Sequence, residues 1–247
     1  MESIDRKKIA KWFTPFPKWA VVFIVIGALL LFPEGAGIKS LGVLLVVIGA
    51  LVIFLDKKAR PTDQQMDAWW EEECKAFQAK AVAKCGQDVA DCVAEEVVVW
   101  GPRLQNRGKA PLLVKAGKDK VIRYNPINLT VINFGPDQLL GYQCSYDRTT
   151  GNFLNESTDE YFYKDVVSVS TKTTSENVSF TIGKQNKTVA AKSQEMFELN
   201  TAGGTSIKVC VSESAILDQV PGGSLPTGQA EKAIQAVRRM LRDKKKA

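Results

Sequence analysis

The chain has 247 residues, of which 45% are hydrophobic and 24% charged, and its formal net charge is +6. These values are ordinary for a globular protein of one or two domains. The absence of histidine excludes Ser-His-Asp and Cys-His catalysis and histidine-containing zinc sites. The five cysteines are odd in number and have no C-x-x-C spacing, so we expect a reduced compartment without a disulfide framework.

Two uncharged apolar runs, residues 19–32 and 41–55, predict a hairpin of two transmembrane helices within residues 19–55. The first run can borrow Trp12, Phe13 and Phe16 at its start, and the second can start at Ile38 with Lys39 snorkelling to the interface. The linker 33–37 is rich in Gly and Pro, which indicates a turn. Each run is shorter than the ~20 residues of a usual span, so the sequence also allows a thin membrane or a hairpin that enters the membrane only to a shallow depth. A signal peptide and a buried soluble hairpin are the alternatives, but no cleavage pattern follows the first run.

Basic residues flank this hairpin on both sides, in the N-terminal segment 1–18 and just after the second run. Positive charges favour the cytoplasmic side, so we expect two spans with both termini in the cytoplasm. The predicted membrane-interface residues are Trp12, Trp19, Lys18, Lys57, Lys58 and Arg60. Membrane lipids are therefore expected partners, whereas nucleic acid is not, because no recognition motif accompanies the basic residues.

Glycines mark one face of each apolar helix. Gly27 lies in the first run, and Gly42 and Gly49 lie seven residues apart in the second. Small residues let helix backbones approach closely in lipid. These glycines serve either the hairpin itself or contacts between protomers, and the sequence favours neither.

A connecting helical region is predicted over residues 61–96. Thr62 and Gln65 have the spacing of a capping box, and the first helix is expected to end at Lys84. Its apolar face includes Trp69 and Trp70, which pack on their own domain or, alternatively, on neighbouring protomers in an oligomer. A second short helix is expected over 88–95. No metal site is expected nearby, because Cys85 and Cys92 lack further ligands.

From residue 97 the pattern changes to short strands separated by turns, and the domain 97–243 ends in an amphipathic helix. The expected strands cover residues 97–100, 127–131, 138–146, 153–163, 166–171, 196–199 and 206–212, with a weaker one over 180–188. Residues 103–120 are predicted to form a basic loop that is either solvated or faces phosphate or lipid. The helix is expected over 230–241, followed by a basic tail, 244–247.

The strand order and the segments 160–169 (EYFYKDVVSV) and 197–209 (FELNTAGGTSIKV), with the helix after them, resemble the pleckstrin-homology-like superfold. Bacterial PH and GRAM-like domains belong to it, and the layout is similar to bacterial two-span membrane proteins with a cytosolic PH-like domain. This resemblance implies that the membrane is a bacterial inner membrane. The resemblance implies an antiparallel β-sandwich or barrel that binds lipid headgroups or protein segments rather than catalysing a reaction. It also implies that lipid binding needs a basic loop between the first two strands; the expected equivalent, residues 135–137, is short and not basic.

The predicted fold class is therefore α+β: a transmembrane helical hairpin, a connecting amphipathic helix and a PH-like β domain with a C-terminal helix. Candidates for lipid or partner binding are Arg103, Arg107, Lys109, Arg238, Arg239 and Arg242. We expect no cofactor, no metal and no small-molecule substrate. Cys144 lies in a strand pattern and is expected to be a buried, inert residue.

The expected function is that of a membrane-anchored, non-enzymatic interaction or scaffold protein, with self-association into a homo-oligomer left open. Its domain would bind a protein partner, neighbouring protomers or the inner leaflet. One alternative is an accessory subunit of a larger membrane complex. Another is a small membrane-bound enzyme or regulator that uses the acids Asp159, Glu160 and Asp165.

Overall fold

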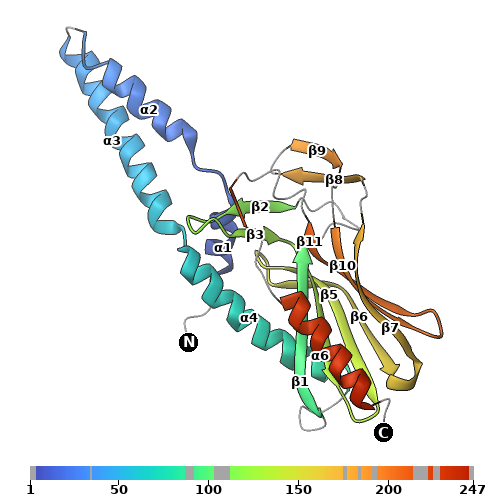
Figure 1. The fold of residues 1–247 in the computed structure, drawn as a ribbon. Coiled ribbons are helices and arrows are strands. Elements are labelled where there is room, and N and C mark those ends of the chain that lie inside the picture. Colours follow the sequence, from blue (N-terminus) through green and yellow to red (C-terminus); the bar gives the residue numbers. More distant parts are fainter. Residues whose placement is uncertain are drawn as a thin grey trace. The chain divides into compact units, whose positions relative to one another are not determined.

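The computed structural model describes residues 4–33, 35–86, 92–102, 112–174, 177–182, 185–190, 194–213, 222–224 and 229–244. The chain forms two compact units, Met1–Met66 and Asp67–Ala247. The first is helical and the second combines helices with antiparallel sheets (Figure 1), so the α+β class is confirmed. The boundary between the units lies inside a helix, after Met66.

The first unit begins with a helix that was not predicted. Its helices are α1 (Arg6–Phe13), α2 (Lys18–Leu29) and α3 (Ala36–Ala59). The segment 14–17 separates α1 from α2, which are bent by 64°, because Pro15 and Pro17 cannot continue a helix. Asp5 caps α1, accepting a hydrogen bond from the Lys8 backbone N–H at 3.1 Å. Figure 1 shows α2 and α3 side by side as a hairpin.

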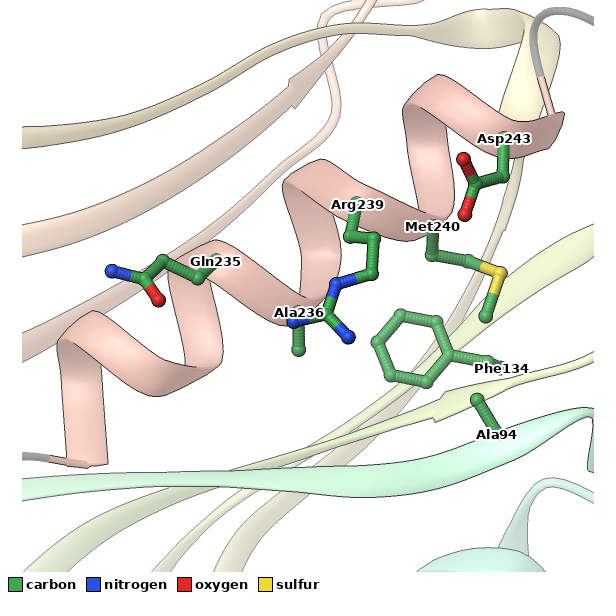
Figure 2. A pocket seen from close by; sticks show the side chains of 7 residues that line it. All are labelled: Ala94, Phe134, Gln235, Ala236, Arg239, Met240 and Asp243. Atoms are coloured by element: carbon green, nitrogen blue, oxygen red, sulfur yellow. The ribbon is translucent and has the colours of Figure 1, made fainter.

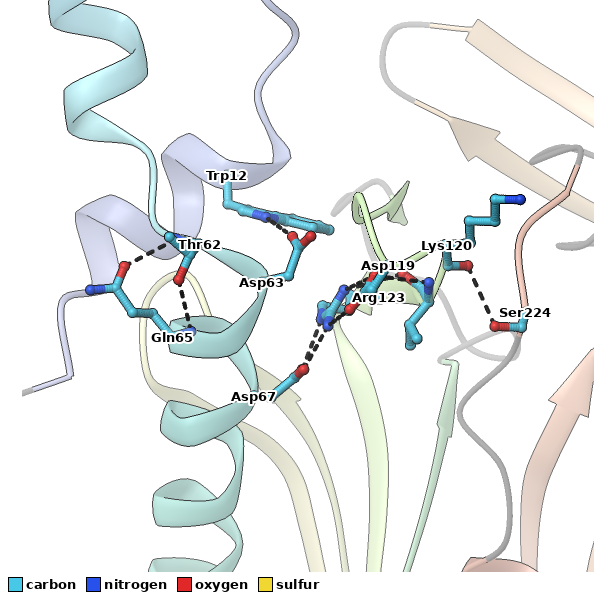
Figure 3. A network of polar contacts seen from close by, with 10 residues as sticks. Trp12, Thr62, Asp63, Gln65, Asp67, Asp119, Lys120, Arg123 and Ser224 are labelled. Carbon is cyan, nitrogen blue, oxygen red and sulfur yellow. Dashed lines mark hydrogen bonds and ion pairs between the residues drawn. The ribbon is translucent and has the colours of Figure 1, made fainter.

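The long helix α4 (Asp63–Lys84) follows, and its predicted start is confirmed in detail. The Thr62 N–H donates to Gln65 Oε1 at 3.0 Å and the Gln65 N–H donates to Thr62 Oγ1 at 3.2 Å, which is a complete capping box (Figure 3). The helix ends at Lys84 as predicted, and Gly86 then takes a positive φ of 69°. The second helix predicted over 88–95 is wrong at its end, because Ala94 begins a strand; residues 88–91 lie outside the described residues.

A four-stranded antiparallel sheet with the order β1-β4-β5-β6 forms one layer of the second unit. Its strands are β1 (Ala94–Pro102), β4 (Ile127–Phe134), β5 (Gln138–Asp147) and β6 (Asn152–Phe162). The turns at 135–137 and 148–151 fall where Gly, Pro, Asp and Thr predict them. Between β1 and β4 the chain forms a hairpin of β2 (Leu113–Ala116) and β3 (Ile122–Asn125), so the basic loop predicted over 103–120 is wrong at 113–116.

A three-stranded sheet with the order β11-β10-β7 forms the second layer. Its strands are β7 (Val166–Thr174), β10 (Gln194–Thr201) and β11 (Ser206–Glu213), with a separate hairpin of β8 (Asn177–Ile182) and β9 (Gln185–Ala190) inserted after β7. The short helix η2 (Tyr163–Asp165) connects β6 to β7. The C-terminal helix α6 (Gln229–Lys244) lies along β1 (Figure 1).

Alternation along the central strands gives the first sheet two buried faces. On β4, Ile132 and Phe134 point into the main core, which also holds Phe197 of β10 and Val237 of α6. Leu129 and Val131 point the opposite way, into a second core beneath α4. Besides these two, this second core is built from Phe77, Ala81, Tyr142, Cys144 and Tyr146. The apolar face of α4 therefore packs on its own domain.

A carboxylate on the three-stranded sheet makes folding dependent on pH. Glu198 of β10 is paired with Lys172 at 2.7 Å and with Lys208 at 3.7 Å. The hydrogen bond from Lys172 lowers the pKa of Glu198, although its burial opposes this. A depressed folded-state pKa contributes stability above the unfolded-state value that is lost as the pH falls through the folded-state value.

We therefore expect Glu198→Gln to remove roughly 1 kcal/mol of unfolding free energy at neutral pH, since both lysines are more than half exposed. The variant should also lose less stability than the wild type on acidification below about pH 4.5. Urea unfolding at several pH values measures both effects. Glu160→Gln, at an exposed position on β6, is the control, and an equal effect there would refute the assignment.

Candidate functional site

The hairpin has an unusually large exposed apolar surface. The stretch Ala36–Lys84 is long and apolar enough to cross a membrane, and only 11% of its most apolar window is buried. The helices α1 and α2 are bent relative to each other, and they qualify as a second span only if the two helices are counted together as one span. The exposed side chains are Trp19, Val21, Val22, Val25, Ile26, Leu29, Leu31, Phe32, Ile38, Leu41, Val43, Leu44, Val47, Ile48, Leu51, Phe54 and Leu55. Such a continuous surface marks contact with membrane or protein.

The three glycines form the seam of the hairpin. A Cβ atom on Gly27 would lie 2.6 Å from the carbonyl oxygen of Gly42, and one on Gly42 would lie 2.7 Å from that of Gly27. At Gly49 a Cβ would lie 2.6 Å from the carbonyl oxygen of Ala20 and also 2.6 Å from Ile24. All three glycines are buried. Of the two roles open from the sequence, the structure therefore shows the packing of α2 on α3.

A buried carboxylate holds the base of the hairpin together. Asp56, whose side chain is 3% exposed, is paired at 2.7 Å with both Lys11 of α1 and Arg60. The Arg60 guanidinium also donates to the carbonyl oxygens of Lys11, Thr14 and Pro15 at 2.8–3.0 Å, which satisfies the C-terminal end of α1. This set, Asp56, Lys11 and Arg60, is called the basal clamp. Arg60, predicted at the membrane interface, thus has a structural role at the base of the hairpin.

Trp12, which was also predicted at the membrane interface, is buried within the first unit. It is 3% exposed, and its indole N–H donates to the Asp63 carboxylate at 3.2 Å (Figure 3). Trp19, in contrast, is 51% exposed. Lys18, Lys57 and Lys58 are exposed around the ends of the hairpin helices, as an interfacial role requires.

Quenching by lipids with brominated acyl chains distinguishes the two tryptophans. We expect Trp19→Phe to remove most of the tryptophan fluorescence that such lipids quench in the reconstituted protein, because Trp19 is the exposed one. Trp12→Phe is the matched variant and should leave the quenched fraction unchanged. The opposite pattern would contradict the burial of Trp12.

Trp69 is buried within the chain, and Trp70 packs on other aromatic residues of the chain. Trp69 is 5% exposed, and the Trp70 ring packs against Trp100 at 4.9 Å and Phe77 at 5.7 Å. The Arg148 guanidinium lies 5.0 Å from the Trp70 ring centre. These tryptophans therefore have little exposed surface left for the contacts between protomers that were predicted for them.

An ion pair buried beneath α4 was not predicted. Arg148 Nε donates to Glu73 Oε2 at 2.7 Å, and the Tyr146 hydroxyl donates to Glu73 Oε1 at 3.0 Å. The Arg148 and Glu73 side chains are 4% and 1% exposed. A second guanidinium, that of Arg123, joins Asp67 of α4 to Asp119 with two 2.7 Å bonds (Figure 3). These pairs fix α4 to the sheet.

Among the described residues, a groove beside α6 is a candidate site for binding a ligand. Its volume is about 390 Å³, and its floor is Phe134 and Met240. Figure 2 shows the Arg239 guanidinium beside the Phe134 ring and the Asp243 carboxylate near Met240; Ala94, Gln235 and Ala236 complete the lining. Its volume lies within the range of ligand pockets, and it joins an apolar floor to two opposite charges.

The structure describes three of the six predicted basic candidates. Only Arg239 lines the groove. Arg238 lies on the other flank of α6, where it donates to the Val169 carbonyl at 3.3 Å, and Arg242 is exposed. Arg103, Arg107 and Lys109 lie outside the described residues. Arg238, Arg239 and Arg242 are all exposed and, at helical spacing, lie within about 100° of one another around α6, so the three described candidates form one basic stripe.

The acids of the alternative enzyme hypothesis do not form a common site. Asp159 and Glu160 are consecutive on β6 and therefore point to opposite faces, and Asp165 lies in η2. Among the described residues no group of three His, Cys, Asp or Glu side chains could hold a metal ion. Burial raises the pKa of Cys144 to about 11, so its thiol is protonated at neutral pH and is a poor nucleophile.

The geometry defines an α+β protein with an apolar helical hairpin and a groove in its sheet-containing unit. Comparisons with protein-family models, with curated proteins and with solved structures gave no match to this chain.

Proposed function

We propose that this protein is a membrane-anchored, non-enzymatic binding module whose hairpin holds a protein-binding β domain at the cytoplasmic face of a membrane. The observation that carries the proposal is the exposed apolar surface of α2 and α3, which has no polar face to present to water. Burying such a surface in lipid is favoured by about 25 cal/mol per Å² of apolar area. Basic residues at the base of the hairpin support a cytoplasmic orientation of both termini.

The strand order supports a PH-like β domain. The resemblance implies about seven antiparallel strands followed by a C-terminal amphipathic helix, and the four- and three-stranded sheets with α6 against the core are consistent with that number and order. In this assignment β2 and β3, and likewise β8 and β9, are hairpins inserted between the framework strands. The connection between the first two framework strands is then residues 103–126, between β1 and β4, rather than the turn 135–137. That connection is basic, which favours proximity to an anionic surface.

The α6 groove supports recognition of a protein segment. Phe134 and Met240 would accept one large apolar side chain, and Met adapts its shape to irregular partners. Arg239 would pair with a carboxylate of the segment, and Asp243 would accept from an N–H group or a basic side chain. Self-association through the glycines is not part of the proposal, because these residues pack within the hairpin.

Membrane anchoring is tested by placing lysines on the exposed apolar face. Val47 and Leu51 are 56% and 54% exposed, and each lysine costs about 3 kcal/mol at the centre of a membrane helix. We expect Val47→Lys with Leu51→Lys to shift most of the protein out of carbonate-washed membranes. Leu154→Lys with Val167→Lys, at exposed apolar positions of the β domain, is the control and should stay bound. Equal retention of both double variants would refute the anchor.

Groove binding is tested by selecting displayed random peptides on the full-length protein in nanodiscs. We expect the enriched peptides to pair a large apolar side chain with an acidic one. Arg239→Glu should weaken their binding at least tenfold, which corresponds to about 1.4 kcal/mol. Arg238→Glu, on the other flank of α6, should not weaken it. Enrichment of peptides that bind both variants equally well would contradict the assignment of the groove.

A further inference from the structure

The two arms of the hairpin differ in apolar length, and the shorter arm sets how much membrane the hairpin can span. We infer that this hairpin fits a bilayer whose hydrocarbon core is thinner than usual, and that Lys18 sets this limit. The inference rests on the proposed membrane anchoring and adds the kind of bilayer that the anchor selects.

The register of the arms follows from the glycine contacts. Gly27 lies against Gly42 near the turn, and Gly49 lies against Ala20 and Ile24 near the base. Because the arms are antiparallel, Lys18 comes about one helical turn beyond the level of Gly49. The second arm continues there with Phe54 and Leu55, which are 64% and 53% exposed.

The apolar lengths follow from this register. In the first arm the uncharged stretch is residues 19–32, which spans about 20 Å at 1.5 Å per residue. In the second arm the apolar stretch is residues 38–55, in which Lys39 is the one charged residue. This stretch spans about 26 Å. The hydrocarbon core of a typical bilayer is about 30 Å thick. The first arm is thus about one-third too short.

The first arm cannot gain length by straightening into α1. Pro15 and Pro17 interrupt the helix, and α1 is bent by 64° from α2. The basal clamp holds this bend, because Arg60 donates to the carbonyls of Thr14 and Pro15 while Asp56 pairs with Lys11. The base of the first arm therefore stays at Lys18.

A short hairpin responds to a thick bilayer by thinning it locally or by snorkelling of its lysines, and each response costs a fraction of a kcal/mol per Å of mismatch. Lys18 and Lys39 are both exposed and can snorkel, so the mismatch produces a preference rather than an exclusion. Summed over a mismatch of about 10 Å, the preference for a thin bilayer should be at least tenfold.

The test is cell-free synthesis of the full-length protein with preformed vesicles of dimyristoleoyl-, dioleoyl- or dierucoylphosphatidylcholine, whose chains lengthen in that order. The inserted fraction is the protein that floats with the vesicles after a carbonate wash. We expect insertion to fall at least tenfold from the shortest to the longest lipid. Lys18→Leu extends the apolar first arm towards Pro15 and should raise insertion into the longest lipid. Lys7→Leu removes the same charge from an exposed position of α1 and should not raise it.

The outcomes separate the two proposals. Failure to float with any of the three lipids would refute membrane anchoring itself. Equal insertion into all three would leave the anchor in place and refute the preference for thin bilayers. A preference for thin bilayers that Lys18→Leu leaves unchanged would refute Lys18 as its cause.

Discussion

Arg148→Met is expected to destabilise the β domain by about 3–5 kcal/mol, a large part of the stability of a typical domain. The substitution leaves the Glu73 carboxylate, 1% exposed, without the guanidinium that now donates to it at 2.7 Å. The Tyr146 hydroxyl would remain as a donor, but one neutral hydrogen bond cannot replace a charged partner. The stacking of Arg148 on Trp70 would be lost as well. Urea unfolding of the full-length protein in detergent, followed by near-ultraviolet circular dichroism, measures the loss.

Lys80→Met is the matched control for this prediction. Lys80 also pairs with a glutamate, Glu156, at 3.1 Å, but both side chains are 28% exposed. Water can therefore solvate Glu156 after the change, and we expect a loss of roughly 1 kcal/mol or less. Similar losses in the two variants would mean that the Glu73–Arg148 pair is solvated in solution, contrary to the structure.

Gly49→Leu is expected to separate the arms of the hairpin. A Cβ at this position would lie 2.6 Å from the backbone oxygen of Ala20, which cannot move away without shifting α2. Overpacking of this kind costs about 1–3 kcal/mol and more when the neighbour is backbone. The midpoint of thermal aggregation of the full-length protein in detergent should fall, and proteolysis within residues 30–35 should become faster.

Gly37→Leu is the control, because a Cβ there meets nothing within 4 Å. It should leave both the aggregation midpoint and the proteolysis rate close to those of the wild type. If Gly49→Leu instead changed only the mass of the detergent-solubilised particle, the glycine would serve contacts between protomers. That result would support glycine contacts between protomers and contradict their role in packing α2 on α3.

Local signals in the sequence predicted most elements of the fold. The capping box at Thr62 and Gln65, the glycine after Lys84 and the turns of the β meander each depend on a few neighbouring residues. Their physical causes are short-ranged, so a sequence pattern is enough. The apolar period of α4 likewise predicted its buried face, although not which sheet face it covers.

The missed elements depend on contacts between residues far apart in the chain. The amphipathic α1 could have been predicted from Ile9 and Trp12, three residues apart and both buried, but its basic residues favoured an interfacial segment. The strand β2 exists because it pairs with β3, and no alternation marks its four residues. The apparent helix end at 94–95 is instead a strand because Ala94 pairs with Phe134.

The site was less predictable than the fold. Glycine spacing identified the residues of the hairpin seam, but only the 2.6 Å approaches distinguish packing within the hairpin from packing between protomers. Asp56 and Arg60, four residues apart at the end of an apolar run, were a usable signal for the basal clamp. The α6 groove joins Phe134 to Met240, and no sequence pattern brings these two residues together.

Protease protection in sealed vesicles tests the central claim, that the hairpin is embedded in a membrane while the β domain lies outside it. The full-length protein is reconstituted with the β domain facing outward and digested with proteinase K. We predict one protected, carbonate-resistant fragment that contains residues 19–55, with loss of the sequence after it. Complete digestion of residues 19–55 in intact vesicles would contradict the account.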